Sequence, residues 1–61
     1  MKISQNETYY SPSGDMALEF DKNRKCWYVR NVPYLGSQWG VILDDLDANN
    51  AQVLLNKWRG G

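Results

Sequence analysis

The sequence predicts an α+β fold in which a three-stranded antiparallel β-meander carries one C-terminal α-helix on one face. In the middle of the chain, apolar and polar residues alternate with a period of two, which is typical of strands with one buried face. Near the C-terminus, apolar residues recur with the three- and four-residue spacing of an amphipathic helix. With 61 residues, 43% of them hydrophobic and 23% charged, the chain is long enough for one small domain.

The N-terminal segment is the least patterned part of the chain. Residues 1–14 are polar, and we expect them to form an arm or one edge strand in front of a single βββα domain at 15–61. Pro12 and Gly14, set among Ser and Asp residues, mark a turn at the end of this segment.

A hairpin is predicted next. Apolar residues alternate over 16–20 and predict a first strand, and the charged run 21–25 is expected to form the turn. Residues 26–32 are rich in aromatic and β-branched side chains and predict the second strand. Pro33 ends this strand because proline has no N–H to donate to a β-ladder.

The third strand and the helix complete the meander. Residues 33–38 are expected to connect the strands, and 39–43 to form the third strand. Asp47 is a favourable N-cap for a helix over 48–58, and Gly60 is expected at the C′ position that follows the helix. The apolar face of this helix would consist of Ala51, Leu54, Leu55 and Trp58.

The predicted helix divides the sheet into a buried face and an open face. We expect the helix to cover Met16, Leu18, Phe20, Trp27, Val29, Val41 and Leu43. The opposite face then presents Tyr28, Arg30 and Ile42, with Ala17, Glu19 and Cys26 around them. The open face is where we expect function.

The composition excludes most catalytic and metal sites. With no histidine and one cysteine, a single chain has no internal disulfide, no Cys/His zinc site, no Ser-His-Asp triad and no Cys-His pair. The acidic run 44–47 is interpreted as helix-capping charge or as a patch for a basic partner, and Cys26 as a small apolar residue on a strand. We therefore expect no enzyme activity, no metal and no cofactor.

Neither a membrane-spanning run nor a signal peptide is recognised in the sequence, so we expect a cytoplasmic protein without a membrane partner. The small size suggests a phage or mobile-element origin as a hypothesis.

The charges cancel overall but are segregated along the sequence. Seven basic and seven acidic residues give a net charge of zero. Four of the basic residues, Lys22, Arg24, Lys25 and Arg30, fall within positions 22–30 of the predicted hairpin, where Trp27 and Tyr28 interleave with them. Cations beside aromatic rings are typical of nucleic-acid-binding surfaces, so this hairpin supports an alternative function in nucleic-acid binding, with affinity that falls as salt rises.

The order of three strands and a helix resembles that of the plant AP2-type and phage-integrase arm-type DNA-binding domains. The resemblance runs through the strand 27–30 and through the passage from the third strand into residues 46–51. It implies a short sheet backed by a C-terminal helix and a role in DNA binding, and it assigns no individual residue.

The preferred function is a small non-enzymatic protein-binding module, acting as an inhibitor or accessory regulator. Tyrosine and tryptophan in or beside turns are hard to bury in so small a domain, and with arginine they are typical of interface hot spots. The candidate surface consists of Tyr28, Arg30, Tyr34, Leu35, Trp39 and Ile42. A small core also favours self-association, so a homo-oligomer is compatible with this function.

Overall fold

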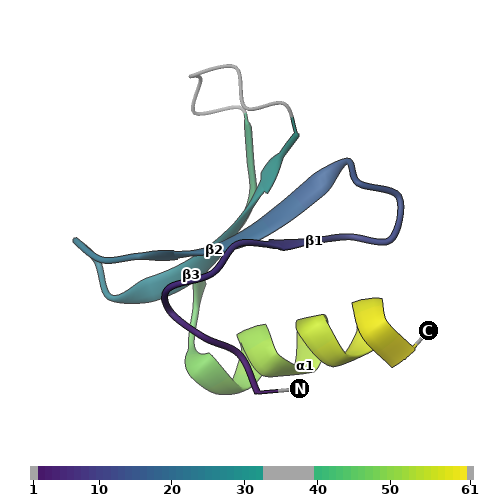
Figure 1. Ribbon diagram of the computed structural model, residues 1–61. Coiled ribbons are helices and arrows are strands. Elements are labelled where there is room, and N and C mark those ends of the chain that lie inside the picture. Colours follow the sequence, from purple (N-terminus) through teal and green to yellow (C-terminus); the bar gives the residue numbers. More distant parts are fainter. Residues whose placement is uncertain (1, 33–39, 61) are drawn as a thin grey trace.

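The computed structural model describes residues 2–32 and 40–60, which form one antiparallel sheet and one helix. The elements are β1 (Tyr9–Tyr10), β2 (Met16–Asp21), β3 (Cys26–Asn31), β4 (Val41–Leu46) and α1 (Ala48–Gly60). The strands are arranged in the order β1-β2-β3-β4, and α1 lies against one face of the sheet (Figure 1). The α+β class and the C-terminal helix are therefore as predicted, but the sheet has four strands rather than three. Within the described residues, α1 is the one helix, and it is too short and too polar to cross a membrane.

The fourth strand comes from the N-terminal segment, for which an arm or an edge strand was expected. Tyr9 pairs with Leu18, and Tyr10 pairs with Ala17. Only 4% of Tyr9 is exposed, and its hydroxyl accepts a 2.7 Å hydrogen bond from the Ser4 N–H. Burial of this ring holds the edge strand on the sheet.

The predicted hairpin is confirmed, with small changes at its ends. Strands β2 and β3 pair in an unbroken register from Met16 opposite Asn31 to Asp21 opposite Cys26. Asp21 organises the turn, because its carbonyl accepts the Lys25 N–H at 2.7 Å and its side chain accepts the Asn23 N–H at 2.9 Å. Lys25 itself has a left-handed φ of 57°.

The last strand differs most from the prediction. It was expected at 39–43, but β4 runs from Val41 to Leu46 and includes the first two aspartates of the acidic run. Its register against β3 shifts twice, and the paired residues are Trp27 with Leu46, Val29 with Leu43, and Arg30 with Val41. At each shift β4 contains one more residue than β3, which is the definition of a β-bulge. Asp45 lies in the bulge between Leu43 and Leu46 and has a left-handed φ of 55°.

The bulges change which residues face the helix. Val41 and Leu43 were predicted to be buried under the helix, but they are 36% and 45% exposed. Because Val41 is paired with Arg30, it shares the open face with that residue. For Val41 the prediction failed because the bulge between Leu43 and Val41 shifts the alternation of β4 by one residue. Leu43 is paired with Val29 and so keeps the side of the helix, but its side chain is left partly uncovered.

The core lies between α1 and the face of the sheet that β1, β2 and β3 form. Its buried residues are Tyr9, Leu18, Trp27, Val29, Ala51 and Leu55, with Ile3, Met16, Phe20, Leu46, Leu54 and Trp58 packed around them. The rings of Phe20 and Trp27 meet edge to face, with 4.6 Å between their centroids. The Ile3 N–H donates to Gln52 Oε1 at 2.7 Å, which ties the N-terminal segment to the helix.

The helix begins as predicted but ends later. Asp47 is its N-cap, since its side chain accepts the Asn50 N–H at 2.7 Å. The expected C′ position for Gly60 is wrong, because Gly60 is still part of α1 and has no left-handed φ. The basic last turn, with Lys57 and Arg59, favours continuation of the helix to this point.

Two leucines test this assignment of core and surface. Leu18 is fully buried, so Leu18→Ala is expected to lower the free energy of unfolding by about 2–5 kcal/mol. Leu43 is 45% exposed, so Leu43→Ala is expected to lower it by less than about 1 kcal/mol. Urea denaturation followed by circular dichroism measures both values. Equal destabilisation by the two variants would contradict the exposed position of Leu43.

Candidate protein-binding surface

The open face of the sheet carries a charged network centred on Glu19. Glu19 lies directly opposite Tyr28 on β3, and the Tyr28 hydroxyl donates to Glu19 Oε2 at 2.8 Å. Arg30 lies two residue pairs further along on the same face and reaches back diagonally, so that its Nε donates to the same oxygen at 2.9 Å. Thr8 donates its hydroxyl to Glu19 Oε1 at 2.8 Å. The two-residue period of the paired strands places the strand residues of this network on one face.

The network fixes the protonation states of its members. The Arg30 hydrogen bond is the main cause that holds the pKa of Glu19 at about 2, with Tyr28 and Thr8 contributing in the same direction. Desolvation and the Glu19 carboxylate raise the pKa of Tyr28 to about 12. At neutral pH, Glu19 and Arg30 are therefore an ion pair and Tyr28 is a neutral hydrogen-bond donor.

A second charged cluster joins the β2-β3 turn to β4. Arg24 Nε contacts Asp21 Oδ2 at 3.1 Å, and its Nη1 donates to Asp44 Oδ2 at 3.0 Å, with Nη2 on the other oxygen of Asp44. Asp45 lies 3.4 Å from the same guanidinium. The Arg24 guanidinium lowers the pKa of both Asp21 and Asp44.

These contacts bear on the alternative nucleic-acid surface. Of its four basic residues, Arg24 and Arg30 are held by carboxylates, while Lys22 and Lys25 are exposed in the turn. A phosphate that approached either arginine would have to compete with an existing carboxylate contact. The basic turn and the acidic run are far apart in the sequence but meet in the fold, where the charge of Arg24 is balanced by Asp44 and Asp45.

An open hollow with a volume of about 510 Å³ lies between the two charged clusters. Its lining residues are Glu19, Asp21, Arg24, Tyr28, Arg30 and Val41. Glu19 and Arg30 form an ion pair across β2 and β3, Asp21 and Arg24 form one within the β2-β3 turn, and the Tyr28 hydroxyl donates to Glu19. The polar groups that line the hollow therefore bond to one another, and Val41 supplies its apolar side.

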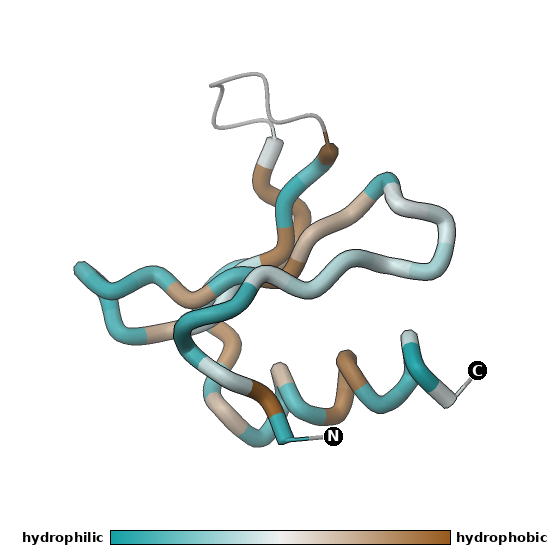
Figure 2. Tube along the Cα trace, in the orientation of Figure 1, coloured by the Kyte–Doolittle hydropathy of each residue, from teal (hydrophilic) through white to brown (hydrophobic). Residues whose placement is uncertain are grey.

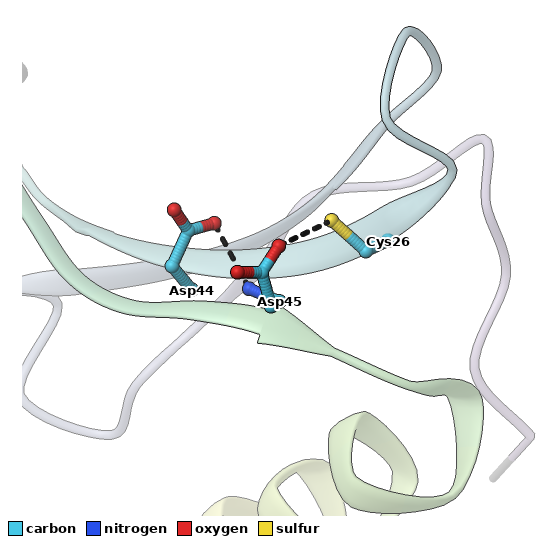
Figure 3. Close-up of side chains that lie close together, drawn as sticks. All are labelled: Cys26, Asp44 and Asp45. Carbon is cyan, nitrogen blue, oxygen red and sulfur yellow. Dashed lines mark hydrogen bonds between the residues drawn. The ribbon is translucent and has the colours of Figure 1, made fainter.

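A third group lies on the same side of β3 and β4, and the sequence did not reveal it. Cys26 Sγ lies 3.7 Å from Asp45 Oδ1, and with Asp44 these residues place three potential ligand atoms within 4.8 Å of one another (Figure 3). Desolvation is the main cause that raises the pKa of the Cys26 thiol; Arg24 lowers it, and Asp45 and Asp44 raise it further. A protonated thiol is a poor metal ligand, and Asp44 is already bound to Arg24.

Beside the charged face, strand β4 exposes an apolar edge. Val41, Ile42 and Leu43 are consecutive and are 36%, 46% and 45% exposed. We refer to these three residues as the β4 edge. Among the described residues, β4 is one of the two edge strands of the sheet and pairs with β3, and Figure 2 shows this hydrophobic stretch where the described chain resumes after the grey segment. Val41 also lines the hollow, so the apolar edge and the charged face are continuous.

The structure brings together part of the predicted surface. Tyr28 and Arg30 meet through Glu19, and Ile42 lies on the β4 edge beside them. The predicted contacts Tyr34, Leu35 and Trp39 lie outside the described residues. Sequence reasoning assigned Val41 and Leu43 to the core, and no pattern in the sequence marks the bulge between them.

No protein-family model matches this sequence, and no curated protein or solved structure gives a significant match. The resemblance to AP2-type and integrase arm-type domains thus gains no support, and the four-stranded sheet departs from it. Function is therefore inferred from the described residues themselves.

Acid titration tests the Glu19 network. A carboxyl whose pKa is lowered in the folded state stabilises the fold above its unfolded pKa and loses this contribution as the pH falls. For Glu19 the window runs from the ordinary value of 4.5 down to about 2. The difference in unfolding free energy between wild type and Glu19→Gln is expected to shrink as pH falls through this window, in urea denaturation at several pH values.

Glu7→Gln, at an exposed glutamate, controls for the removal of one negative charge. A difference between wild type and Glu19→Gln that stays constant from neutral pH to pH 2 would show that the ion pair does not contribute to stability.

Thiol reactivity tests the surroundings of Cys26. Because the folded state raises the pKa of this thiol, its alkylation by iodoacetamide at mildly alkaline pH is expected to be slower in the folded chain than in urea. Asp45→Asn is expected to accelerate the reaction by removing a nearby negative charge, and asparagine tolerates the left-handed φ of 55° at this position. An unchanged or lower rate in Asp45→Asn would contradict the electrostatic influence of Asp45.

Proposed function

We propose that this chain is a small non-enzymatic protein-binding module, an inhibitor or accessory regulator, that binds its partner along the β4 edge. The observation that carries the proposal is the exposure of three consecutive apolar residues on an edge strand of the sheet that the described residues form. An outer strand offers unpaired backbone groups beside its side chains, and partners use such edges by adding a strand of their own. Burial of these side chains would supply the hydrophobic contribution to binding.

The neighbouring charged face suits the rim of such an interface. Tyr28 and Arg30 are residue types that are enriched in interface hot spots, and here Glu19 holds both in fixed positions. Side chains that are already ordered lose less conformational entropy when a partner binds. This arrangement supports Tyr28, Arg30 and Ile42 as members of one binding surface.

The other two function classes find less support among the described residues. The polar groups around the hollow hydrogen-bond one another, which leaves little for the binding and activation of a substrate. The nucleic-acid alternative has two of its four cations engaged by carboxylates. Among the described residues, the β4 edge is a run of adjacent exposed apolar side chains outside the core.

A pair of matched lysine variants tests the proposal. Ile42 and Val53 are similarly exposed, at 46% and 48%, but Ile42 lies on the β4 edge and Val53 lies on α1. In affinity capture from nuclease-treated source-cell lysate, Ile42→Lys is expected to lose the partner that wild type retains, because a charge replaces a buried apolar contact. Val53→Lys is expected to retain it.

Circular dichroism of both variants establishes that each is folded. Retention of the partner by Ile42→Lys would overturn the β4 edge as the binding surface. Loss of the capture on nuclease treatment, together with sensitivity to Lys22→Ala and Lys25→Ala, would favour the nucleic-acid alternative instead.

A further inference from the structure

We propose that residues 2–10 form a strap that opens and closes as one unit while the rest of the fold stays intact, and that the hydrogen bond from Thr8 to Glu19 couples this opening to the open face of the sheet. The proposal does not depend on which partner binds the β4 edge. It follows from the contacts that hold the strap, from the turn at which the strap ends and from the position of Glu19 between the strap and the candidate surface.

The contacts that the structure describes for the strap lie at separate points along it. Strand β1 is two residues long, against six in β2. Tyr9 is buried in the core and Ile3 packs against the core, but Lys2 and residues 5–7 are exposed. A segment that buries little apolar surface opens at a lower free-energy cost than the whole domain. The strap is therefore the part of the described fold that we expect to open first.

Two hydrogen bonds join these separate points into one unit. The Ser4 N–H donates to the Tyr9 hydroxyl at 2.7 Å, so the strap folds back onto its own buried ring. The neighbouring Ile3 N–H donates to Gln52 Oε1 on α1 at 2.7 Å. When Tyr9 leaves the core, Ser4 loses its acceptor, and the adjacent Ile3 loses the support that aligns it with α1. We therefore expect Ile3, Ser4 and Tyr9 to detach together.

The strap ends at a turn that belongs to the stable part of the fold. The Ser11 N–H donates to the Met16 carbonyl at 3.0 Å, and the Met16 N–H donates to Ser11 Oγ at 3.2 Å. The Val32 N–H donates to the Asp15 carbonyl at 3.0 Å, which ties this turn to the end of β3. Opening therefore stops before Ser11 and uncovers the part of β2 that pairs with β1. Unpaired strand edges are templates for pairing with other chains, so the closed strap protects this edge.

Glu19 connects the strap to the open face. Thr8, in the strap, donates to Glu19 Oε1 at 2.8 Å, whereas the Tyr28 hydroxyl and Arg30 Nε donate to Oε2 at 2.8 and 2.9 Å. Donors on both oxygens fix the orientation of the carboxylate, so the loss of one donor weakens the contacts of the others. Such coupling is reciprocal. A partner that orders Tyr28 and Arg30 would therefore favour the closed strap.

Amide hydrogen exchange, followed by NMR on the full-length chain, measures the opening of the strap. The amides of Ile3 and Ser4 are expected to be at least about tenfold less protected than that of Leu55 in the middle of α1. Low urea is expected to accelerate exchange at Leu55 and to leave Ile3 nearly unchanged, because a local opening exposes little surface. Equal protection and equal urea dependence at Ile3 and Leu55 would show that the strap opens only with global unfolding, which overturns the proposal.

A matched pair of tyrosine variants tests whether the strap opens as a unit. Tyr9→Phe keeps the buried ring and removes the hydroxyl that accepts the Ser4 N–H. It is expected to speed exchange at Ile3 by about threefold to tenfold, although the acceptor of Ile3 on Gln52 is unchanged. Tyr10→Phe, at the exposed neighbour, is expected to change this rate by less than about twofold. Protection in α1 is expected to stay as in wild type for both variants. An unchanged rate at Ile3 in Tyr9→Phe would mean that the segment frays residue by residue, and the strap would be overturned.

A double-mutant cycle tests the coupling through Glu19. Thr8→Val removes the hydroxyl and keeps the shape of the side chain, and Tyr28→Phe removes a donor to the other carboxylate oxygen. Each variant is expected to speed exchange at Ile3, by about threefold for Thr8→Val, and the double variant is expected to show less than the product of the two effects. Effects that multiply, or no effect of Tyr28→Phe, would overturn the coupling. These readouts do not use partner capture, so a failure of this proposal is distinguishable from a failure of the proposed function.

Discussion

The register of β4 against β3 is the constraint on which the rest of the structure depends. One end of β4 must place Leu46 opposite Trp27, because the core closes there against α1. Two bulges within the strand shift this alignment, so that Leu43 lies opposite Val29 and Val41 lies opposite Arg30, and both side chains stay partly exposed. A regular ladder would have enforced strict alternation along the whole strand. The bulges therefore let one short strand contribute to both the core and an exposed apolar edge.

The same register explains how the charges are used. Asp44 and Asp45 reach the β2-β3 turn because β4 runs back along β3 toward that turn, and Arg24 meets both of them. These groups are exposed, so each contact contributes little stability by itself. Their main effect is to neutralise two segments that are strongly charged in the sequence, which leaves the apolar edge as the most distinctive surface of the described residues.

The small core shows why an additional contact is useful to this chain. The largest fully buried side chains are Leu18, Val29 and Leu55. Within the described residues, Trp27 Nε1 is also buried without a hydrogen-bond partner, and such a group costs about 1–3 kcal/mol. Domains of this size often gain stability through association. A partner bound at the β4 edge would bury apolar surface that the described residues leave exposed.

Much of the fold was predictable because it depends on local patterns. The hairpin follows from alternation over Met16–Asp21 and Cys26–Asn31, and the helix follows from the Asp47 cap and its apolar repeat. The edge strand β1 was predicted only as one of two alternatives, because two tyrosines are too few to show a period. Tyr28 and Arg30 were predicted to lie outside the core, and the regular pairing of β3 with β2 explains why the period of two was sufficient there. Ile42 is exposed as well, but its neighbours lie in a bulge, so the period of two does not explain its position.

The sequence by itself determined the α+β class, the hairpin, the start of the helix and the exclusion of histidine-dependent chemistry. Only the tertiary structure decided the register of β4, the pairing of Arg24 with Asp44 and the meeting of Cys26 with Asp45. The physical reason is that periodicity and capping act over one to four residues, whereas a bulge forms when core packing outweighs the regular ladder. The contacts that shape the candidate surface join residues about twenty positions apart, and no local pattern encodes them.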